Sequence, residues 1–187
     1  MTASDDPRFA LPRLASIAGA VHSECMIIIL MGVSGSGKTT IGQLLAQDLG
    51  WTFYDGDDFH PSANVEKMRQ GIPLTDEDRD SWLAALQQLI ETILHQHRSA
   101  VLACSALKQE YRQRLQCDRE EVRFVYLKGD YELIRKRLDA RQGHFMRADL
   151  LRSQFATLEE PHDMLTIDVA QSPQAIVTAI ITAFRLR

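Results

Sequence analysis

Three glycines, a lysine and two threonines stand together in the stretch LMGVSGSGKTT, residues 30–40. The order Gly32-x4-Gly37-Lys38-Thr39 is the pattern of a phosphate-binding loop, and it falls between an apolar run and a helix-like run, as that pattern requires. A loop that wraps a polyphosphate aims several backbone N–H groups inward, where Cβ atoms would obstruct it. The sequence therefore predicts a nucleotide site rather than a glycine-rich turn that binds nothing.

Each part of this loop has a predicted task. The N-terminus of the following helix adds partial positive charge. Lys38 is expected to reach the β- and γ-phosphates, and the Thr39 hydroxyl to bind Mg²⁺. The residues expected to contact ATP are Gly32, Val33, Ser34, Gly35, Ser36, Gly37, Lys38, Thr39 and Thr40.

Two aspartates, Asp55 and Asp57, follow a second predicted strand at 51–55. Because ligands of open parallel sheets bind outside the carboxyl ends of the strands, both carboxylates are expected beside the phosphate loop. One can hold the metal ion through water, while the other orients an acceptor hydroxyl and accepts its proton. Asp58 competes for either role, and simple turn capping is the alternative interpretation.

The elements that position these residues alternate in type. Short apolar runs predict buried strands, and amphipathic spacing predicts helices. Strands are expected at 26–30, 51–55, 100–104, 122–127 and 164–169. Helices are expected at 39–50, 61–71, 75–97, 107–115 and 131–141, in the second half of 142–155, and at 173–186. This alternation predicts parallel βαβ units in an α/β sandwich.

Size and composition limit the function classes. The chain has 187 residues, of which 45% are hydrophobic and 25% charged, as is ordinary for one soluble globular domain. The net charge of −4 gives no broad field that attracts nucleic acid. No apolar run reaches the roughly 20 residues of a membrane helix. Residues 1–25 are interpreted as a poorly ordered N-terminal extension, and the domain as residues 26–187, with Met26 as an alternative start.

The cysteines favour a cytoplasmic protein. There are three, Cys25, Cys104 and Cys117, and they form no Cys-x-x-Cys pair or Cys/His cluster with the spacing of metal ligands. Reduced thiols in a cytosol are the simplest interpretation.

Several segments together resemble the gluconokinase family, which is related in fold to shikimate and nucleoside-monophosphate kinases. They are MGVSGSGKTT, FYDGDDFHP, NVEKMRQGIPLTDEDRDSWL, CSALKQEYR, FVYLKGDYELIRKRLDARQGHFM and SQFATLEEP. The resemblance implies transfer of the ATP γ-phosphate to the 6-hydroxyl of D-gluconate. It also implies a three-layer sandwich with a five-stranded parallel sheet of order 2-3-1-4-5, a small helical lid at about 141–156, and a homodimer.

The resemblance also implies roles for particular residues. Asp55 is similar in position to a metal-side carboxylate, and Asp57 to the carboxylate on the substrate hydroxyl. Arg137 is expected to stack near the adenine, and Arg141 to reach the phosphates as a catalytic residue beside Lys38. By the same similarity, the segment 168–174 is expected to border the adenine through backbone contacts, with an ordinary strand-to-helix loop capped by Ser172 as the alternative.

A sugar acid needs hydrogen-bonding groups for its hydroxyls and a cation for its carboxylate, ideally a bidentate arginine. The residues expected to bind the substrate are Asp57, His60, Arg79, Ser105, Lys108, Arg112 and His144. For Arg79, the alternatives are a salt bridge to Asp76 or Asp78, or simple exposure to solvent. For Lys108 and Arg112 the alternative is a solvated helix face, and for His144 it is a structural role. The sequence leaves open which of Arg79, Lys108 and Arg112 holds the carboxylate.

Two other functions remain possible at this point. One is a kinase of the same fold for another small acid or a nucleotide. The other is a nucleotide-dependent switch or regulatory ATPase, although the guanine-specificity motif Asn-Lys-x-Asp, the Asp-x-x-Gly motif and the Leu-Ser-Gly-Gly signature of transport ATPases are all missing from the chain.

Overall fold

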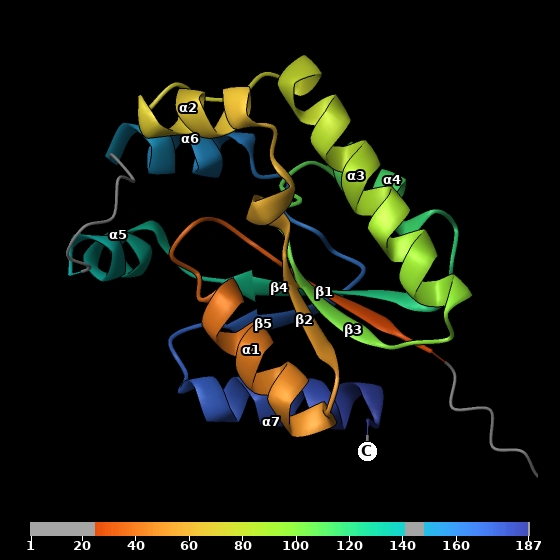
Figure 1. Cartoon of the computed structure of the whole chain (residues 1–187). Coiled ribbons are helices and arrows are strands. Elements are labelled where there is room, and N and C mark those ends of the chain that lie inside the picture. Colours follow the sequence, from red (N-terminus) through yellow and green to blue (C-terminus); the bar gives the residue numbers. More distant parts are fainter. Residues whose placement is uncertain (1–24, 141–147, 187) are drawn as a thin grey trace, which may run out of the picture.

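A parallel five-stranded sheet forms the middle layer of a three-layer α/β sandwich in the computed structural model, which describes residues 25–140 and 148–186 (Figure 1). The strand order is β2-β3-β1-β4-β5, so the predicted order is confirmed. The strands are β1 (Ile27–Met31), β2 (Thr52–Asp55), β3 (Ala100–Ala103), β4 (Val122–Lys128) and β5 (Leu165–Asp168).

The central strand β1 is the most deeply buried element. Every one of its five residues has 0% exposure, as a strand covered on both faces requires. Ile29 is in register with Leu102 of β3 on one side and with Phe124 of β4 on the other. The loop that leaves the carboxyl end of β1 therefore starts from a rigid position in the middle of the sheet.

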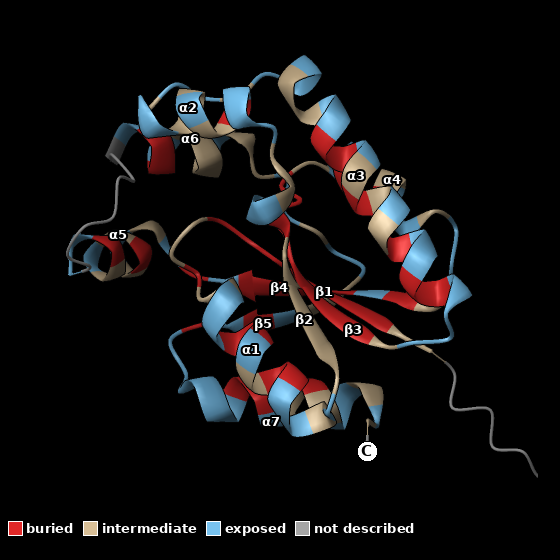
Figure 2. Ribbon diagram, viewed as in Figure 1, coloured by how far each residue is buried: buried red, intermediate tan, exposed pale blue. Residues whose placement is uncertain are grey.

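Helices cover both faces of the sheet. In the described residues they are α1 (Lys38–Leu49), α2 (Ser62–Arg69), α3 (Asp76–His95), α4 (Gln109–Gln116), α5 (Tyr131–Asp139), α6 (Ala148–Thr157) and α7 (Pro173–Phe184). Helices α3 and α4 pack together over one face, and α1 and α7 over the other (Figure 1). Figure 2 shows that the buried residues of these helices lie on the sides that face the sheet.

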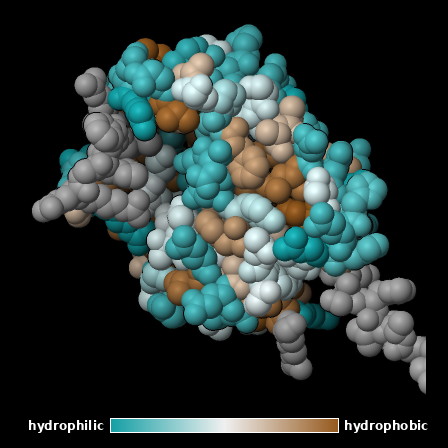
Figure 3. Space-filling model, viewed as in Figure 1, coloured by the Kyte–Doolittle hydropathy of each residue, from teal (hydrophilic) through white to brown (hydrophobic). Residues whose placement is uncertain are grey.

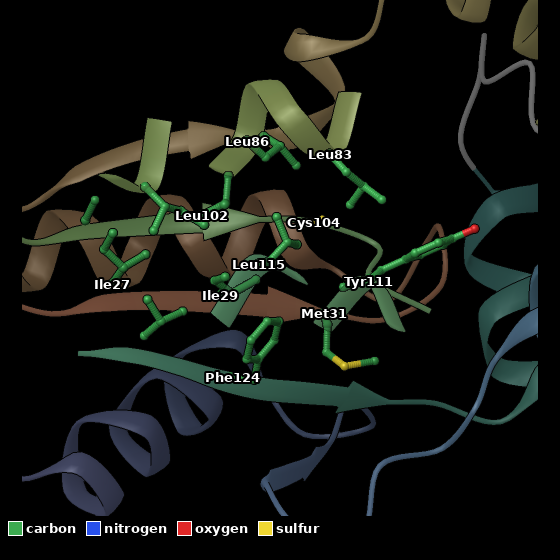
Figure 4. Packing of buried hydrophobic residues seen from close by; sticks show 14 of the residues in the cluster. Ile27, Ile29, Met31, Leu83, Leu86, Leu102, Cys104, Tyr111, Leu115 and Phe124 are labelled. Carbon is green, nitrogen blue, oxygen red and sulfur yellow. The ribbon is translucent and has the colours of Figure 1, made fainter. Parts of the chain in front are cut away.

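Two apolar clusters fill the space between the layers. One joins alternate residues of β1 to helix α3, with Ile29, Leu83 and Leu86 among its members (Figure 4). The other joins the remaining β1 residues to α1 and α7, with Leu30, Leu45 and Ile176 among its members. This two-sided burial fixes β1 and α1, the two elements that flank the phosphate loop.

The structure differs from the sequence expectation mainly near element ends. Helix α4 begins at Gln109 rather than Leu107, because Lys108 has the extended backbone of an N-cap residue, with φ −91° and ψ 148°. A short 3-10 helix, η2 (Gly56–Phe59), was not expected, and it starts where the Asp55 side chain accepts a hydrogen bond from the N–H of Asp57.

Part of the predicted lid forms helix α6, but residues 141–147 lie outside the described residues, as do residues 1–24 of the predicted extension. Among the helices that the structure describes, none has the length and apolar character needed to cross a bilayer. The face shown in Figure 3 is mostly hydrophilic, and the apolar side chains that reach it gather beside the edge strand β2.

Candidate active site

The phosphate loop joins β1 to α1 with a backbone that glycine makes possible. Gly32, Gly35 and Gly37 have φ values of +143°, +84° and +97°, a region that residues with a Cβ rarely adopt. At Gly32 a Cβ would also lie 2.8 Å from the carbonyl oxygen of Leu127. The loop conformation therefore depends on these glycines, as the motif predicted.

The predicted ATP contacts of the loop separate into two groups. A pocket between the loop and β2 is lined by Ser34, Gly35, Gly37, Lys38, Thr39, Thr40, Asp55 and Asp57. Gly32, Val33 and Ser36 do not line this pocket, and the side chains of Val33 and Ser36 are buried beneath the loop. The loop thus offers one set of residues to a ligand and uses the other for its own packing.

Lys38 is the first residue of α1, whose N-cap is Gly37 in the left-handed conformation. Its ammonium group donates hydrogen bonds to the carbonyl oxygens of Gly32 at 3.0 Å and Val33 at 3.1 Å. The ammonium therefore lies against the first residues of the loop, and Lys38 lines the pocket that would receive a phosphate.

Thr39 and Asp55 come together beside the loop. The Thr39 hydroxyl donates a 2.8 Å hydrogen bond to Oδ2 of Asp55, and Oδ1 of Asp55 accepts one from the backbone N–H of Asp57 at 3.2 Å. Carboxylate and hydroxyl oxygens suit Mg²⁺, which is commonly held by one or two carboxylates together with substrate phosphates. No group of three or more His, Cys, Asp or Glu side chains with metal-binding geometry occurs in the described residues.

Asp57 lies where two hollows meet. It lines the phosphate-loop pocket, and it also lines a larger cavity of about 300 Å³, as do Lys38 and Ser34. Asp58, its sequence competitor, lines neither of these two spaces but a third hollow, which it shares with Thr39 and Asp55. The turn of η2 thus directs the two neighbouring aspartates toward different spaces.

The larger cavity is lined by several elements. Its other lining residues are His60, Val65, Met68, Arg69, Pro73, Leu74, Arg79, Trp82, Ser105, Leu107, Tyr111, Leu150, Ser153, Gln154 and Thr157. Helices α2 and α6, which lie side by side in Figure 1, both contribute residues. The cavity combines apolar walls with a few polar and charged groups, as small-molecule sites commonly do.

His60 is held on the cavity wall by Trp82. The two rings stack with centroids 4.5 Å apart and planes inclined by 11°, and the indole N–H of Trp82 donates a 2.7 Å hydrogen bond to the carbonyl of Gly56. Burial lowers the pKa of His60, and Arg79 lowers it further, while Asp57 acts in the opposite direction. The buried Nδ1 has no hydrogen-bond partner within the described residues, so it is a polar group available to a ligand.

Arg79 also lines the cavity, from the first turn of α3. One of its guanidinium nitrogens donates to the carbonyl of Leu74 at 2.7 Å and lies 3.8 Å from Asp76. The guanidinium carbon is 5.8 Å from the centre of the Tyr111 ring. The salt bridge to Asp76 that the sequence offered as an alternative therefore coexists with a position on the cavity wall.

Lys108 and Arg112 do not line the cavity. Lys108 pairs with Asp76 at 2.6 Å, and its hydrogen bond is the main reason why the pKa of the Asp76 carboxyl is lowered. Arg112 is buried and donates to the carbonyls of Ala106 and Leu107 at 3.1 and 3.0 Å, so the alternative of a solvated helix face is wrong for this residue. Its contacts hold the loop that carries Ser105, and its predicted contact with substrate stays a prediction that this geometry does not favour.

Arg137 reaches the end of β5. Its guanidinium donates a 2.6 Å hydrogen bond to the carbonyl oxygen of Val169, in the segment 168–174 that was expected to border an adenine. The two features predicted for the base are therefore neighbours in space. Arg141 and His144 lie outside the described residues.

Arg69, Tyr111 and Gln154 are among the cavity-wall residues that were not predicted as substrate contacts. The positions of Arg69 and Tyr111 could have been predicted from the sequence, because both are polar residues near the ends of segments that lead to the site. Cys104, at the end of β3, is buried, and burial raises the pKa of its thiol to about 12. It is therefore a protonated core residue and not a nucleophile.

The sheet order, the glycine-dependent loop and the paired carboxylates define a phosphate-loop kinase. A family model described as shikimate kinase matches residues 34–185. The thermoresistant gluconokinase of Escherichia coli (strain K12) is 41% identical over 163 residues, which cover 85% of this chain and 93% of that protein. The gluconokinase of Gluconobacter oxydans (strain 621H) is 44% identical over 161 residues, which cover 84% and 90%. The chain belongs to the gluconokinase family, within the shikimate kinase-like group that the model describes.

Solved structures agree with this assignment. A gluconokinase from Sinorhizobium meliloti 1021 is 40% identical and superposes with a TM-score of 0.77, covering 85% of this chain and 91% of that one. A sugar kinase from Janibacter sp. HTCC2649 is 41% identical with a TM-score of 0.81, covering 87% and 95%. The APS kinase CysC of Mycobacterium tuberculosis, at 16% identity and a TM-score of 0.62, supports the fold alone.

Proposed function

We propose that this protein transfers the γ-phosphoryl group of ATP to the 6-hydroxyl of D-gluconate and forms 6-phosphogluconate. The observation that carries the proposal is the position of Asp57, which lines both the phosphate-loop pocket and the larger cavity. A donor phosphate in the first space and an acceptor alcohol in the second would meet at this carboxylate. Phosphoryl transfer needs such an arrangement, because its catalysis rests mostly on positioning and on charge stabilisation.

The donor side would be held by the loop. Backbone N–H groups of the glycine-rich turn and the N-terminus of α1 favour phosphate oxygens. Lys38 would leave the carbonyls of Gly32 and Val33 to stabilise the transferred charge, and Arg141 is proposed to assist it. Arg137 and the segment 168–174 are proposed to hold the adenine.

The residues beside the loop fit Mg²⁺. Thr39 and Asp55, whose oxygens lie 2.8 Å apart, would hold the ion together with the nucleotide phosphates. When bound, Mg²⁺ neutralises phosphate charge in reactions of this class. Asp55 is directed toward Thr39, whereas Asp57 lines the larger cavity, which supports a division of labour between the two carboxylates.

The acceptor side would be held in the larger cavity. Asp57 would orient the reacting hydroxyl and accept its proton. His60 and Ser105 offer hydrogen-bonding atoms to other hydroxyls, and Arg79 offers a guanidinium to the carboxylate. Lys108 would act on the substrate indirectly through its ion pair with Asp76, and His144 remains a proposed contact.

An acceptor panel tests this function. ADP release is measured with ATP and Mg²⁺ in the presence of D-gluconate, other aldonates, shikimate and nucleoside monophosphates. We expect release that depends on gluconate, with 6-phosphogluconate as the product. Preference for shikimate or a nucleotide would identify the kinase of the same fold for another acceptor, and slow hydrolysis that ignores every acceptor would identify a nucleotide-dependent switch.

We further propose that the protein acts in the cytoplasm as a homodimer. All three cysteines of the chain are free, which agrees with a reducing compartment. The dimer rests on the family resemblance, and light scattering during size-exclusion chromatography tests it.

A further inference from the structure

Gln154 of helix α6 forms two hydrogen bonds with the phosphate loop. Its side-chain oxygen accepts a 2.7 Å hydrogen bond from the backbone N–H of Ser34, and its side-chain nitrogen donates a 3.1 Å hydrogen bond to the Ser34 hydroxyl. A backbone N–H only donates, so this pairing fixes which way the Gln154 amide faces. Both polar ends of one side chain are thus used on a single residue 120 positions away.

The contact lies at the junction of the donor and acceptor spaces. Ser34 lines both the phosphate-loop pocket and the larger cavity, and Gln154 lines the larger cavity. Lys38 and Asp57 line both spaces as well. Gln154 therefore belongs to the wall of the proposed acceptor site, and its partner belongs to the proposed ATP site.

Helix α6 also carries other parts of the acceptor wall. Leu150, Ser153 and Thr157 line the same cavity. Just beyond the helix, Glu159 attaches to the loop after β3, since its N–H donates to Leu107 at 3.0 Å and its carboxylate accepts from the N–H of Gln109. Gln154 lies five residues earlier, within α6, and ties the same segment to a different loop.

We propose that Gln154 is a positioning residue that sets the acceptor wall on α6 against the phosphate loop. The inference rests on the proposed function, because it assumes that the larger cavity holds the acceptor. A shift of α6 relative to Ser34 would move the acceptor away from the phosphate, and small misplacements of reacting groups are costly in rate. Gln154 would act through Ser34 and the helix position, without reaching the transferred phosphate itself.

The substitution Gln154→Leu tests this role, because it keeps the size of the side chain and removes both hydrogen bonds. We expect kcat/KM for gluconate to fall about tenfold, as the loss of two hydrogen bonds suggests. The KM for ATP should stay within about twofold, and thermal unfolding should occur near the wild-type temperature. If this variant does not fold, Gln154→Asn, which is one methylene shorter, provides the same test. Ala156→Gln places a glutamine at an exposed position of the same helix and should behave as wild type.

A second measurement separates positioning from a general structural role. In the Ser34→Ala background the hydroxyl that Gln154 contacts is gone, so Gln154→Leu should cost less there than in the wild-type background. Three results would overturn the proposal. They are a loss in the double variant equal to the product of the two single-variant losses, an unchanged kcat/KM for gluconate in Gln154→Leu, and a loss of ATP affinity as large as the loss for gluconate.

Failure of the proposed function gives a different result. It appears as absent turnover of gluconate by the wild-type protein. The Gln154 comparison is then made with whichever acceptor of the panel supports wild-type turnover, and the ratio of variant to wild type still decides the role of Gln154.

Discussion

The hydroxyl of Thr39 lies 2.8 Å from Oδ2 of Asp55, so a residue of the phosphate loop and a residue at the end of β2 share one hydrogen bond. The two lie 16 positions apart in the chain. They meet because β1 and β2 end at the same edge of a parallel sheet, with β3 between them. This pair gives the proposed metal site its geometry before any ligand arrives.

Asp55→Asn should raise the Mg²⁺ concentration needed for half-maximal activity by about 10- to 100-fold, the range typical of groups that act on a metal through its bound waters. Initial rates at saturating ATP over a series of Mg²⁺ concentrations measure this. Thr39→Val should show the same defect, whereas Thr39→Ser, which keeps the hydroxyl, should not. An unchanged Mg²⁺ dependence in both Asp55→Asn and Thr39→Val would rule out this metal site.

Asp57→Asn should lower kcat by about 10²- to 10⁴-fold, the usual contribution of a positioned general base. ATP affinity should remain near the wild-type value, because the side chain is proposed to act on the acceptor. Equilibrium binding of a fluorescent ATP analogue and steady-state kinetics measure the two quantities. Asp58→Asn is the comparison for the acceptor step, since Asp58 lines the hollow beside Thr39 and Asp55 and does not line the larger cavity. A fully active Asp57→Asn would remove Asp57 from the chemistry.

The sequence predicted the parts of the site that are encoded locally. The phosphate loop is recognisable because its backbone requires glycine at fixed spacing, and its positive φ values confirm the reason. The N-terminus of α3 was also predictable, since Thr75 and Asp78 form a capping box within four residues of chain. The sheet order followed from the resemblance, because alternation of strands and helices alone does not determine which strands are neighbours.

The parts that the sequence could not predict depend on contacts between distant segments. Arg79, Lys108 and Arg112 are equivalent as cations in a sequence, yet one lines the cavity, one pairs with Asp76 and one is buried against backbone carbonyls. Gln154 gave no local signal, because its partner lies 120 residues away. Only the packed structure shows which polar side chains reach the same space.

Arg79→Lys should raise the KM for gluconate. A guanidinium can bind a carboxylate through two parallel hydrogen bonds, and an ammonium cannot reproduce that geometry. A hydrogen bond to a charged group contributes about 1.5–3 kcal/mol, which corresponds to about a 10- to 100-fold loss in kcat/KM.

Steady-state kinetics with gluconate and with glucitol, its analogue without the carboxylate, give the decisive comparison for Arg79. The wild-type protein should favour gluconate strongly, and Arg79→Lys should lose most of that preference. If Arg79→Lys kept the full preference while Lys108→Met lost it, the carboxylate would belong to Lys108 instead.

The environment of His60 predicts a pH dependence of stability. Burial against Trp82 lowers the pKa of His60 below its ordinary value of 6.5, and Arg79 adds to this, while Asp57 opposes it. Below about pH 6.5 the unfolded chain therefore binds a proton at this residue that the folded chain takes up only at lower pH. The contribution of His60 to stability is fully present above pH 6.5 and is lost as the pH falls toward the pKa of the folded state.

Urea unfolding at about pH 7.5 and about pH 5.5 measures this effect. The wild-type protein should lose free energy of unfolding between the two values, and His60→Phe, which keeps an aromatic ring against Trp82, should lose less. His95→Gln replaces an exposed histidine on α3 and should retain the wild-type loss. Because Asp57 opposes the shift, Asp57→Asn should steepen the dependence. Equal losses in the wild type and His60→Phe would show that His60 does not titrate as this packing requires.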